Sequence, residues 1–457
     1  MPYKGEFSNK IMHERLIKNP EFQKRLKELR VAYDTPNRDI TSEIRQMFRI
    51  IDTEDASKNV KIVFAVDGSY TDIPINNNIP SARIGIANFC ASVVKLDELK
   101  KSAQYEFLDP HEFNDTYTTG LLTFVGPLAN IIEEGKTTTS QSIRYAIYKF
   151  MCNKPFDETL PLINTLYTIL KEGNDKTVES FNCPNPECNE HIEWDLEKDN
   201  INPKKCPGCG EEVYLTDWLR LHEAVEEDFE STSILSRLTQ VVEHLLVFNL
   251  IQTCLSNQTL VSLPFSMAFI LDRPLAIYGE PAKLHRYILK YYHKLMQNKN
   301  TPLIIFGLAK SGRLKDHFEL LERRMKEIGE EIPKNAVMLV SDAYRFKYIQ
   351  QRPKRNEYFG QEISWGQDFL FYSKEAKKFV VSLPYSVDEK KKEYYEKMIF
   401  NIDSYSTLPT VLDLINKITT DLYEDAILPV ALAHRYASIS LKPSKQILEM
   451  FARELIK

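Results

Sequence analysis

Four of the seven cysteines lie close together, and their spacing restricts the local fold more than any other feature. They follow the pattern C-x4-C, then seventeen residues, then C-x2-C, at Cys183, Cys188, Cys206 and Cys209. Two such pairs can place four thiolates tetrahedrally around zinc, and a site closed by four protein ligands is structural. His191 is the alternative to Cys188 as the second ligand. We therefore predict a four-cysteine zinc ribbon over residues 181–215.

The charge balance and the hydropathy exclude several classes of protein. The 457 residues include 59 Lys and Arg against 64 Asp and Glu, a net charge of −5. That excludes a uniformly basic nucleic-acid coat but leaves room for a local basic groove. No apolar run reaches the ~18 residues of a membrane span, and the N-terminus is polar. The clustered cysteines suit a reducing compartment, so we expect a cytoplasmic protein without a membrane segment.

Apolar periodicity predicts an α/β architecture in several parts. Residues 1–58 are predicted as a helical N-terminal segment, followed by strands at 61–69 and 82–94 that pair as a hairpin. A strand at 121–125 and two helices within 139–171 complete the first part of a core (59–180). After the ribbon, a second part (216–400) begins with a long helix at 231–254. A helical C-terminal part (401–457) carries His434.

The second part of the core alternates strand and helix, which is typical of parallel β-α-β units. Strands are predicted at 266–271, 303–308 and 336–340, and helices at 282–297 and 314–328. Two further strands, at 369–372 and 379–383, precede the C-terminal helices. The predicted class is α/β, with a mixed sheet flanked by helices.

Two carboxylates directly follow apolar strands. Asp67 ends the run at 61–66, where Gly68 allows a sharp turn and close approach of a substrate, and Asp272 ends the run at 265–271. Glu243 lies at the edge of the buried stripe of the long helix, where an unpaired carboxylate is costly. Together the three could hold a hard cation through oxygen. The alternatives are a simple turn at Asp67, and a Glu243 that is exposed or paired with Arg237.

Two basic side chains are further candidates. Lys310 follows the strand at 303–308 and could hold a phosphate or a water, or could be a solvated loop residue. The segment lacks the spacing of a P-loop, which disfavours a nucleotide hydrolase. His434 follows an apolar turn, where a core or capping histidine is the commoner case. A basic stretch at Lys347, Arg352, Lys354 and Arg355 could line a DNA path, although a solvated loop is the plainer interpretation.

The order of these motifs resembles the NurA nuclease family, which has an RNase H-like (Piwi-like) core. The shared landmarks are Ala65-Val66-Asp67-Gly68-Ser69, Arg237 with Glu243, Leu271-Asp272-Arg273-Pro274-Leu275, Gly307-Leu308-Ala309-Lys310-Ser311, and Leu428-Pro429 with Ala433-His434. The resemblance implies an RNase H-like mixed sheet with the ribbon as an insertion. Similar proteins usually have Asp-Gly where this chain has Asp272-Arg273.

The resemblance also implies a site and an activity. Asp67, Glu243 and Asp272 would bind catalytic Mn²⁺ or Mg²⁺, with His434 as a further catalytic or metal-binding residue and Lys310 assisting charge or proton movement. Glu230 is the reserve for Glu243. The implied protein is a metal-dependent DNA nuclease, an exonuclease on ends and an endonuclease on single strands.

The implied partners and the rival interpretations complete the sequence-based view. Members of the family typically form homodimers that dock on a HerA-type hexameric ATPase, and the role could be DNA end repair or anti-phage defence. One rival is a catalytically inactive zinc-ribbon adaptor that docks such a motor. The other is a metal-dependent nuclease that acts on RNA or an RNA–DNA hybrid.

Overall fold

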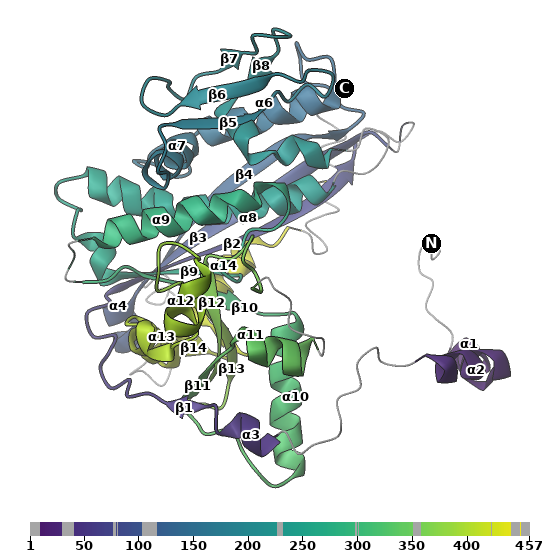
Figure 1. The fold of residues 1–457 in the computed structure, drawn as a ribbon, viewed down its shortest axis with the longest axis vertical. Helices are drawn as coiled ribbons and strands as arrows, with labels where there is room; N and C mark the ends of the chain where they lie inside the picture. Colours follow the sequence, from purple (N-terminus) through teal and green to yellow (C-terminus); the bar gives the residue numbers. More distant parts are fainter. Residues whose placement is uncertain are drawn as a thin grey trace.

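The computed structural model describes residues 10–29, 41–75, 79, 81–102, 117–225, 232–297, 299, 301–350, 358–421, 423–439 and 448. A nine-stranded mixed sheet runs through the described residues, in the order β1-β11-β12-β13-β10-β9-β2-β3-β4 (Figure 1). Its strands are β1 (Arg49–Ile50), β2 (Ile62–Pro74), β3 (Arg83–Lys95), β4 (Tyr117–Ala129), β9 (Met267–Leu271), β10 (Ile304–Ala309), β11 (Ala336–Leu339), β12 (Gly366–Tyr372) and β13 (Lys378–Pro384).

The middle of the sheet is parallel and both of its sides are antiparallel. β2 pairs with β9, and β9 with β10, in parallel, whereas β2, β3 and β4 form an antiparallel meander. The predicted hairpin is confirmed, and each of its strands extends over 13 residues. β3 has the predicted length, whereas β2 extends five residues beyond the predicted run, because its backbone stays paired with β3 as far as Pro74.

The prediction that residues 336–340 continue the parallel set is wrong. The β12–β13 hairpin lies between β10 and β11, and all three of these pairings are antiparallel. β11 therefore runs opposite to β10. The alternation of strand and helix along the chain could not predict that the β12–β13 hairpin lies next to β10. Strand order depends on contacts between distant segments.

Helices cover both faces of the sheet, which confirms the α/β class. One face packs against α6 (Thr139–Cys152), α7 (Leu162–Glu172), α8 (Thr232–Ser256) and α9 (Leu284–Met296). On the same face, α10 (Arg313–Glu327) packs against β11, β12 and β13. The other face packs against α13 (Leu408–Ile418) and α14 (Leu428–Ala437). Residues 63 and 65 of β2 join the second core, while residues 64 and 66 join the first, as strand alternation requires.

The N-terminal segment is helical only in part. α1 (Lys10–Lys18), α2 (Pro20–Glu28) and α3 (Thr41–Arg45) are helices, but Ile50 lies in β1 and pairs with Ala336. The prediction of a helical segment over residues 1–58 is therefore wrong at Ile50. Ile44, Met47 and Ile50 stand at helical spacing, but pairing with the edge of the sheet overrides this weak pattern. α4 (Leu96–Ser102) follows β3 directly.

The long central helix is a core element. α8 is long and apolar enough to cross a membrane, but 83% of its most apolar window is buried inside the protein. It packs against β2 and β3 and contributes residues such as Leu238, Val241 and Leu245 to the larger core.

Candidate functional site

Asp67 lies in the middle of β2, not at its end. Its side chain is buried, and its backbone pairs with Cys90 of β3 in the antiparallel ladder. The expectation that Asp67 and Gly68 form a turn after the strand is therefore wrong. Strand alternation points Asp67 to the face that carries α13 and α14, on the same side as Val63 and Ala65.

Asp272 directly follows β9 and reaches the same level of the sheet. The parallel register pairs Val66 with Leu271, and the Asp272 amide donates to the Val66 carbonyl oxygen at 3.2 Å. The two aspartates are therefore neighbours across adjacent strands. Parallel strands in register bring such side chains together although 205 positions separate them in the chain.

His434 comes to this pair from α14, which crosses β2 and β3. The helix is held by hydroxyls of the sheet, because Ser69 Oγ donates to the Ala437 carbonyl and Ser92 Oγ to the Pro429 carbonyl, each at 2.7 Å. His434 Nδ1 lies 2.7 Å from Asp67 Oδ2. One ligand atom each from Asp67, Asp272 and His434 lies within 4.8 Å of the others.

Lys310 directly follows β10, the strand next to β9, and contacts Asp272 from there. Its Nζ donates to Asp272 Oδ2, while 40% of the side chain stays exposed. A cavity of about 160 Å³ lies beside the group, with Lys310, His434 and Tyr423 in its wall. The Tyr423 ring meets the His434 ring edge-on at 6.0 Å between centroids. Sequence reasoning assigned no role to Tyr423.

Glu243 lies on the opposite face of the sheet and is outside this group. It projects from α8 and is fully buried, and its Oε2 accepts a hydrogen bond from Arg273 Nε. Gly68 makes room for it, because a Cβ at that position would lie 2.9 Å from Glu243 Oε1. Gly68 therefore allows α8 to pack closely against β2, because it has no side chain that would collide with the helix. Arg273 was noted in the sequence only as a departure from the usual glycine.

Two carboxyls near Asp67, those of Asp272 and Glu243, have raised pKa values. Burial, together with the charge of Asp67, raises the pKa of Asp272 to about 7, and Lys310 opposes the rise. Burial also raises the pKa of Glu243, and the Arg273 guanidinium opposes that rise. The hydrogen bond to Asp67 raises the pKa of His434. Carboxyls with raised pKa values in one cluster are typical of functional sites.

The donor set fits a divalent cation. Asp272 Oδ1 and Glu243 Oε1 are both buried, and neither has a hydrogen-bond partner among the described residues. A buried carboxylate oxygen without a partner is costly unless a cation satisfies it. Carboxylate oxygens with one imidazole nitrogen suit Mn²⁺ or Mg²⁺ better than a soft metal. Asp67, Asp272 and His434 are therefore the residues that could hold such an ion.

The cysteine cluster forms a second group that could hold a metal. The Sγ atoms of Cys183 and Cys209 lie 3.7 Å apart, and those of Cys188 and Cys206 lie 3.8 Å apart. Four sulfurs at about 2.3 Å from a tetrahedral zinc are separated by roughly 3.8 Å. The cluster is thus compatible with a zinc ribbon, and His191 is not part of it.

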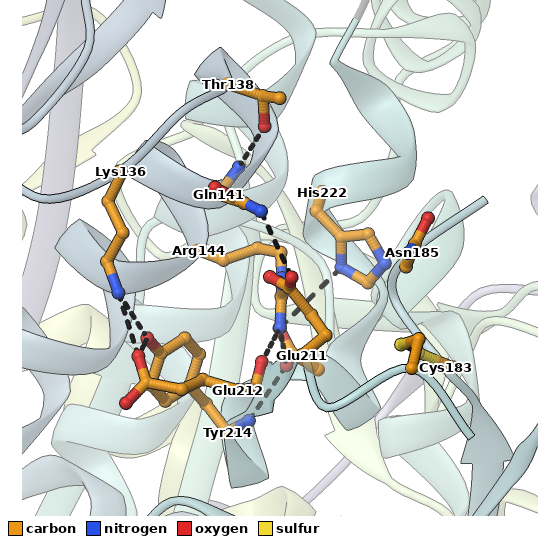
Figure 2. Close-up of polar contacts among 12 residues, drawn as sticks. Lys136, Thr138, Gln141, Arg144, Cys183, Asn185, Glu211, Glu212, Tyr214 and His222 are labelled. Carbon is orange, nitrogen blue, oxygen red and sulfur yellow. Dashed lines mark hydrogen bonds and ion pairs between the residues drawn. The ribbon is translucent and has the colours of Figure 1, made fainter. Parts of the chain in front are cut away.

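The ribbon is built from two short hairpins and is tied to the core. β5 (Val178–Asn182) pairs with β6 (His191–Asp195), and β7 (Lys204–Lys205) with β8 (Glu212–Val213). Figure 2 shows Arg144 of α6 beside Glu211 of the ribbon. Its guanidinium binds Glu211, which directly precedes β8, and Asp217, which follows the ribbon. Apolar ribbon residues such as Trp194 and Val213 join the same core as α8. Sequence reasoning missed Arg144, because its partners are 67 and 73 positions away.

The remaining basic candidates lie away from this centre or outside the described residues. Lys347 pairs with Glu43, which leaves it on the α3 side of the molecule. Arg352, Lys354, Arg355 and the reserve Glu230 lie outside the described residues.

Together these features define an α/β protein in which a mixed sheet, flanked by helices, carries a carboxylate-rich centre. The model of the NurA domain family matches residues 61–439, most of the chain. The chain belongs to the NurA domain family. The crystal structure of the NurA nuclease from Sulfolobus solfataricus matches 98% of this chain and 98% of its own, at 8% sequence identity and a TM-score of 0.36. A search of curated proteins finds no match.

Proposed function

We propose that this protein is a metal-dependent DNA nuclease that hydrolyses phosphodiester bonds at the centre formed by Asp67, Asp272 and His434. The observation that carries the proposal is this cluster, in which Asp272 Oδ1 is buried and lacks a partner among the described residues, in a chain of the NurA domain family. We propose Mn²⁺, or Mg²⁺, as the catalytic ion and Zn²⁺ at the four cysteines.

Each side chain of the centre is assigned a role in phosphodiester hydrolysis. A divalent ion at such a site supplies Lewis-acid activation of the phosphodiester and of water. Asp67, Asp272 and His434 would hold the ion, and Glu243, which is outside this group, would add negative charge from the opposite face. His434, half exposed and bonded to Asp67, would be the nitrogen ligand of that ion. Lys310 is placed to stabilise negative charge on the phosphate because its ammonium group is partly exposed beside Asp272.

The substrate and partners follow from the family and from the charge. A chain with a net charge of −5 neutralises few phosphates and binds DNA weakly by itself. We therefore propose that a homodimer receives DNA ends and single strands from a HerA-type hexameric ATPase, in end processing or anti-phage defence. We place the protein in the cytoplasm, where a cysteine cluster stays reduced.

Cleavage of end-labelled single- and double-stranded DNA tests the activity. Purified protein is assayed with Mn²⁺, Mg²⁺ or chelator, with and without the ATPase, and an RNA of the same sequence is run in parallel. We expect metal-dependent cutting of DNA that is lost in Asp67→Ala, which also controls for contaminating nucleases. If neither ion supports cutting even with the ATPase present, the nuclease proposal fails and the adaptor interpretation stands. Preferential cutting of RNA would instead support the second rival.

A further inference from the structure

Asp272 and Arg273 are adjacent in the chain but serve opposite faces of the sheet. Odd-numbered residues of β9 pack toward α8, and its buried even-numbered residues 268 and 270 pack toward α13 and α14. The bond from the Asp272 amide to Val66 extends this alternation past the end of the strand. Asp272 therefore meets Lys310 on one face, and Arg273 meets Glu243 on the other.

Glu243 already has a cation of its own. It is fully buried, and Gly68 leaves its carboxylate close to the backbone of β2 beside Asp67. A carboxylate in that position needs a positive partner, and Arg273 supplies it through Nε. An Arg side chain keeps its charge at every pH at which the protein is folded. Arg273 therefore supplies a positive charge beside Glu243 at every such pH.

The charge of the whole centre favours one added ion over two. Three carboxylates against Lys310 and Arg273 leave a formal charge of −1 when His434 is neutral. One divalent ion brings the centre to +1, and a second would bring it to +3. The repulsion between two divalent ions is four times that between two unit charges at the same distance. With Glu243 and Asp272 each already paired with a cation, too little negative charge is left to offset that repulsion.

We propose that this centre binds a single divalent ion, held by Asp67, Asp272 and His434, and that Arg273 takes the place of a second ion by neutralising and positioning Glu243. The inference rests on the proposed function, because it concerns the ion of the same nuclease centre. Arg273 is a positioning residue here, since it acts through Glu243.

The number of bound Mn²⁺ ions tests the proposal without any need for turnover. The full-length, zinc-loaded chain is titrated with Mn²⁺, and free ion is followed by its electron paramagnetic resonance signal. We expect one Mn²⁺ per wild-type chain, none at this centre in Asp67→Asn, and two in Arg273→Gln, where Glu243 is released. Arg237→Gln is the matched control, because the Arg237 side chain is 25% exposed, close to the 22% of Arg273, and its ion-pair partner is Glu280. It should bind one ion.

A second variant keeps the test decisive if Arg273→Gln does not fold. Arg273→Gln/Glu243→Gln removes both charges together, which is far milder than leaving one of them buried alone. We expect it to bind one Mn²⁺ with wild-type affinity, since Glu243 is not a ligand. Two ions in the wild type, one ion in folded Arg273→Gln, or loss of the ion in the double variant would each overturn the inference. Two ions with DNA cleavage would overturn it while leaving the nuclease proposal intact, whereas neither Mn²⁺ binding nor cleavage would remove both.

Discussion

Arg144 should be one of the strongest single contributors to the stability of the ribbon region. Its side chain is 3% exposed and that of Asp217 is 2% exposed. Arg144 Nε and Nη2 donate to the two carboxylate oxygens of Asp217 at 2.9 and 2.8 Å, and Nη1 donates to Glu211 at 2.9 Å. Arg144→Met keeps the length of the side chain and leaves Asp217 as a buried charge without its cation. Breaking a buried pair in this way costs about 3–5 kcal/mol.

The contacts of Lys136 provide a matched control in the same region (Figure 2). Lys136 binds Glu212 at 2.8 Å, but Glu212 is 49% exposed. Although Lys136 itself is only 16% exposed, a pair with one partner open to solvent contributes at most about 1 kcal/mol, so Lys136→Met should cost less than Arg144→Met. A double variant, Arg144→Met/Asp217→Asn, should recover part of the loss, because asparagine can still accept from the Tyr214 amide that now donates to Asp217 at 2.8 Å.

Guanidinium unfolding measures these differences. Trp218 is fully buried beside Asp217 and reports local unfolding by its fluorescence, and release of zinc to a chromophoric chelator gives a second readout. We expect Arg144→Met to lower the unfolding midpoint and to speed zinc release, with Lys136→Met close to wild type. Equal effects of Arg144→Met and Lys136→Met would refute the reasoning that burial sets the strength of the Arg144 pairs.

Two further predictions concern packing at the centre and acid stability. Gly68→Ala places a Cβ 2.7 Å from Thr239 Cγ2 and 2.9 Å from Glu243 Oε1, so denaturant unfolding should show a loss of about 1–3 kcal/mol. Adding Thr239→Ser, which removes that methyl group, should restore part of it, and unchanged stability in Gly68→Ala would contradict the packing argument. His285 is fully buried and accepts from Lys390 Nζ at 2.8 Å; burial first, and Lys390 second, lower the pKa of His285 to about 3. Below about pH 6.5, His285 is protonated in the unfolded chain but stays neutral in the folded protein. The free energy of unfolding therefore falls as the pH is lowered from there, by up to about 1.4 kcal/mol per pH unit. His285→Gln, which accepts but does not titrate, should flatten the dependence of the unfolding midpoint on pH between about 6.5 and about 4, and an unchanged slope would show that His285 is not the titrating group.

Most of the secondary structure followed from local patterns. The β2–β3 hairpin, the third strand of the meander, the long helix α8 and the helices of residues 139–171 all lie where apolar periodicity places them. The direction of β11 and the strand at Ile50 did not follow, because both depend on which distant segment pairs with them. Periodicity identifies the type of an element but carries no information about its neighbours.

The sequence by itself determined the ligand chemistry: four cysteines at ribbon spacing, and two aspartates attached to apolar strands that meet in one sheet. Only the tertiary structure decided how the other charges are used. It brought His434 to Asp67 across 367 positions, and it placed Glu243 and Arg273 together on the opposite face. The reason is that residues 272 and 273 alternate across the sheet, so adjacent charges in the chain end in separate environments. Spacing along the chain sets which atoms are available, whereas packing decides which of them meet.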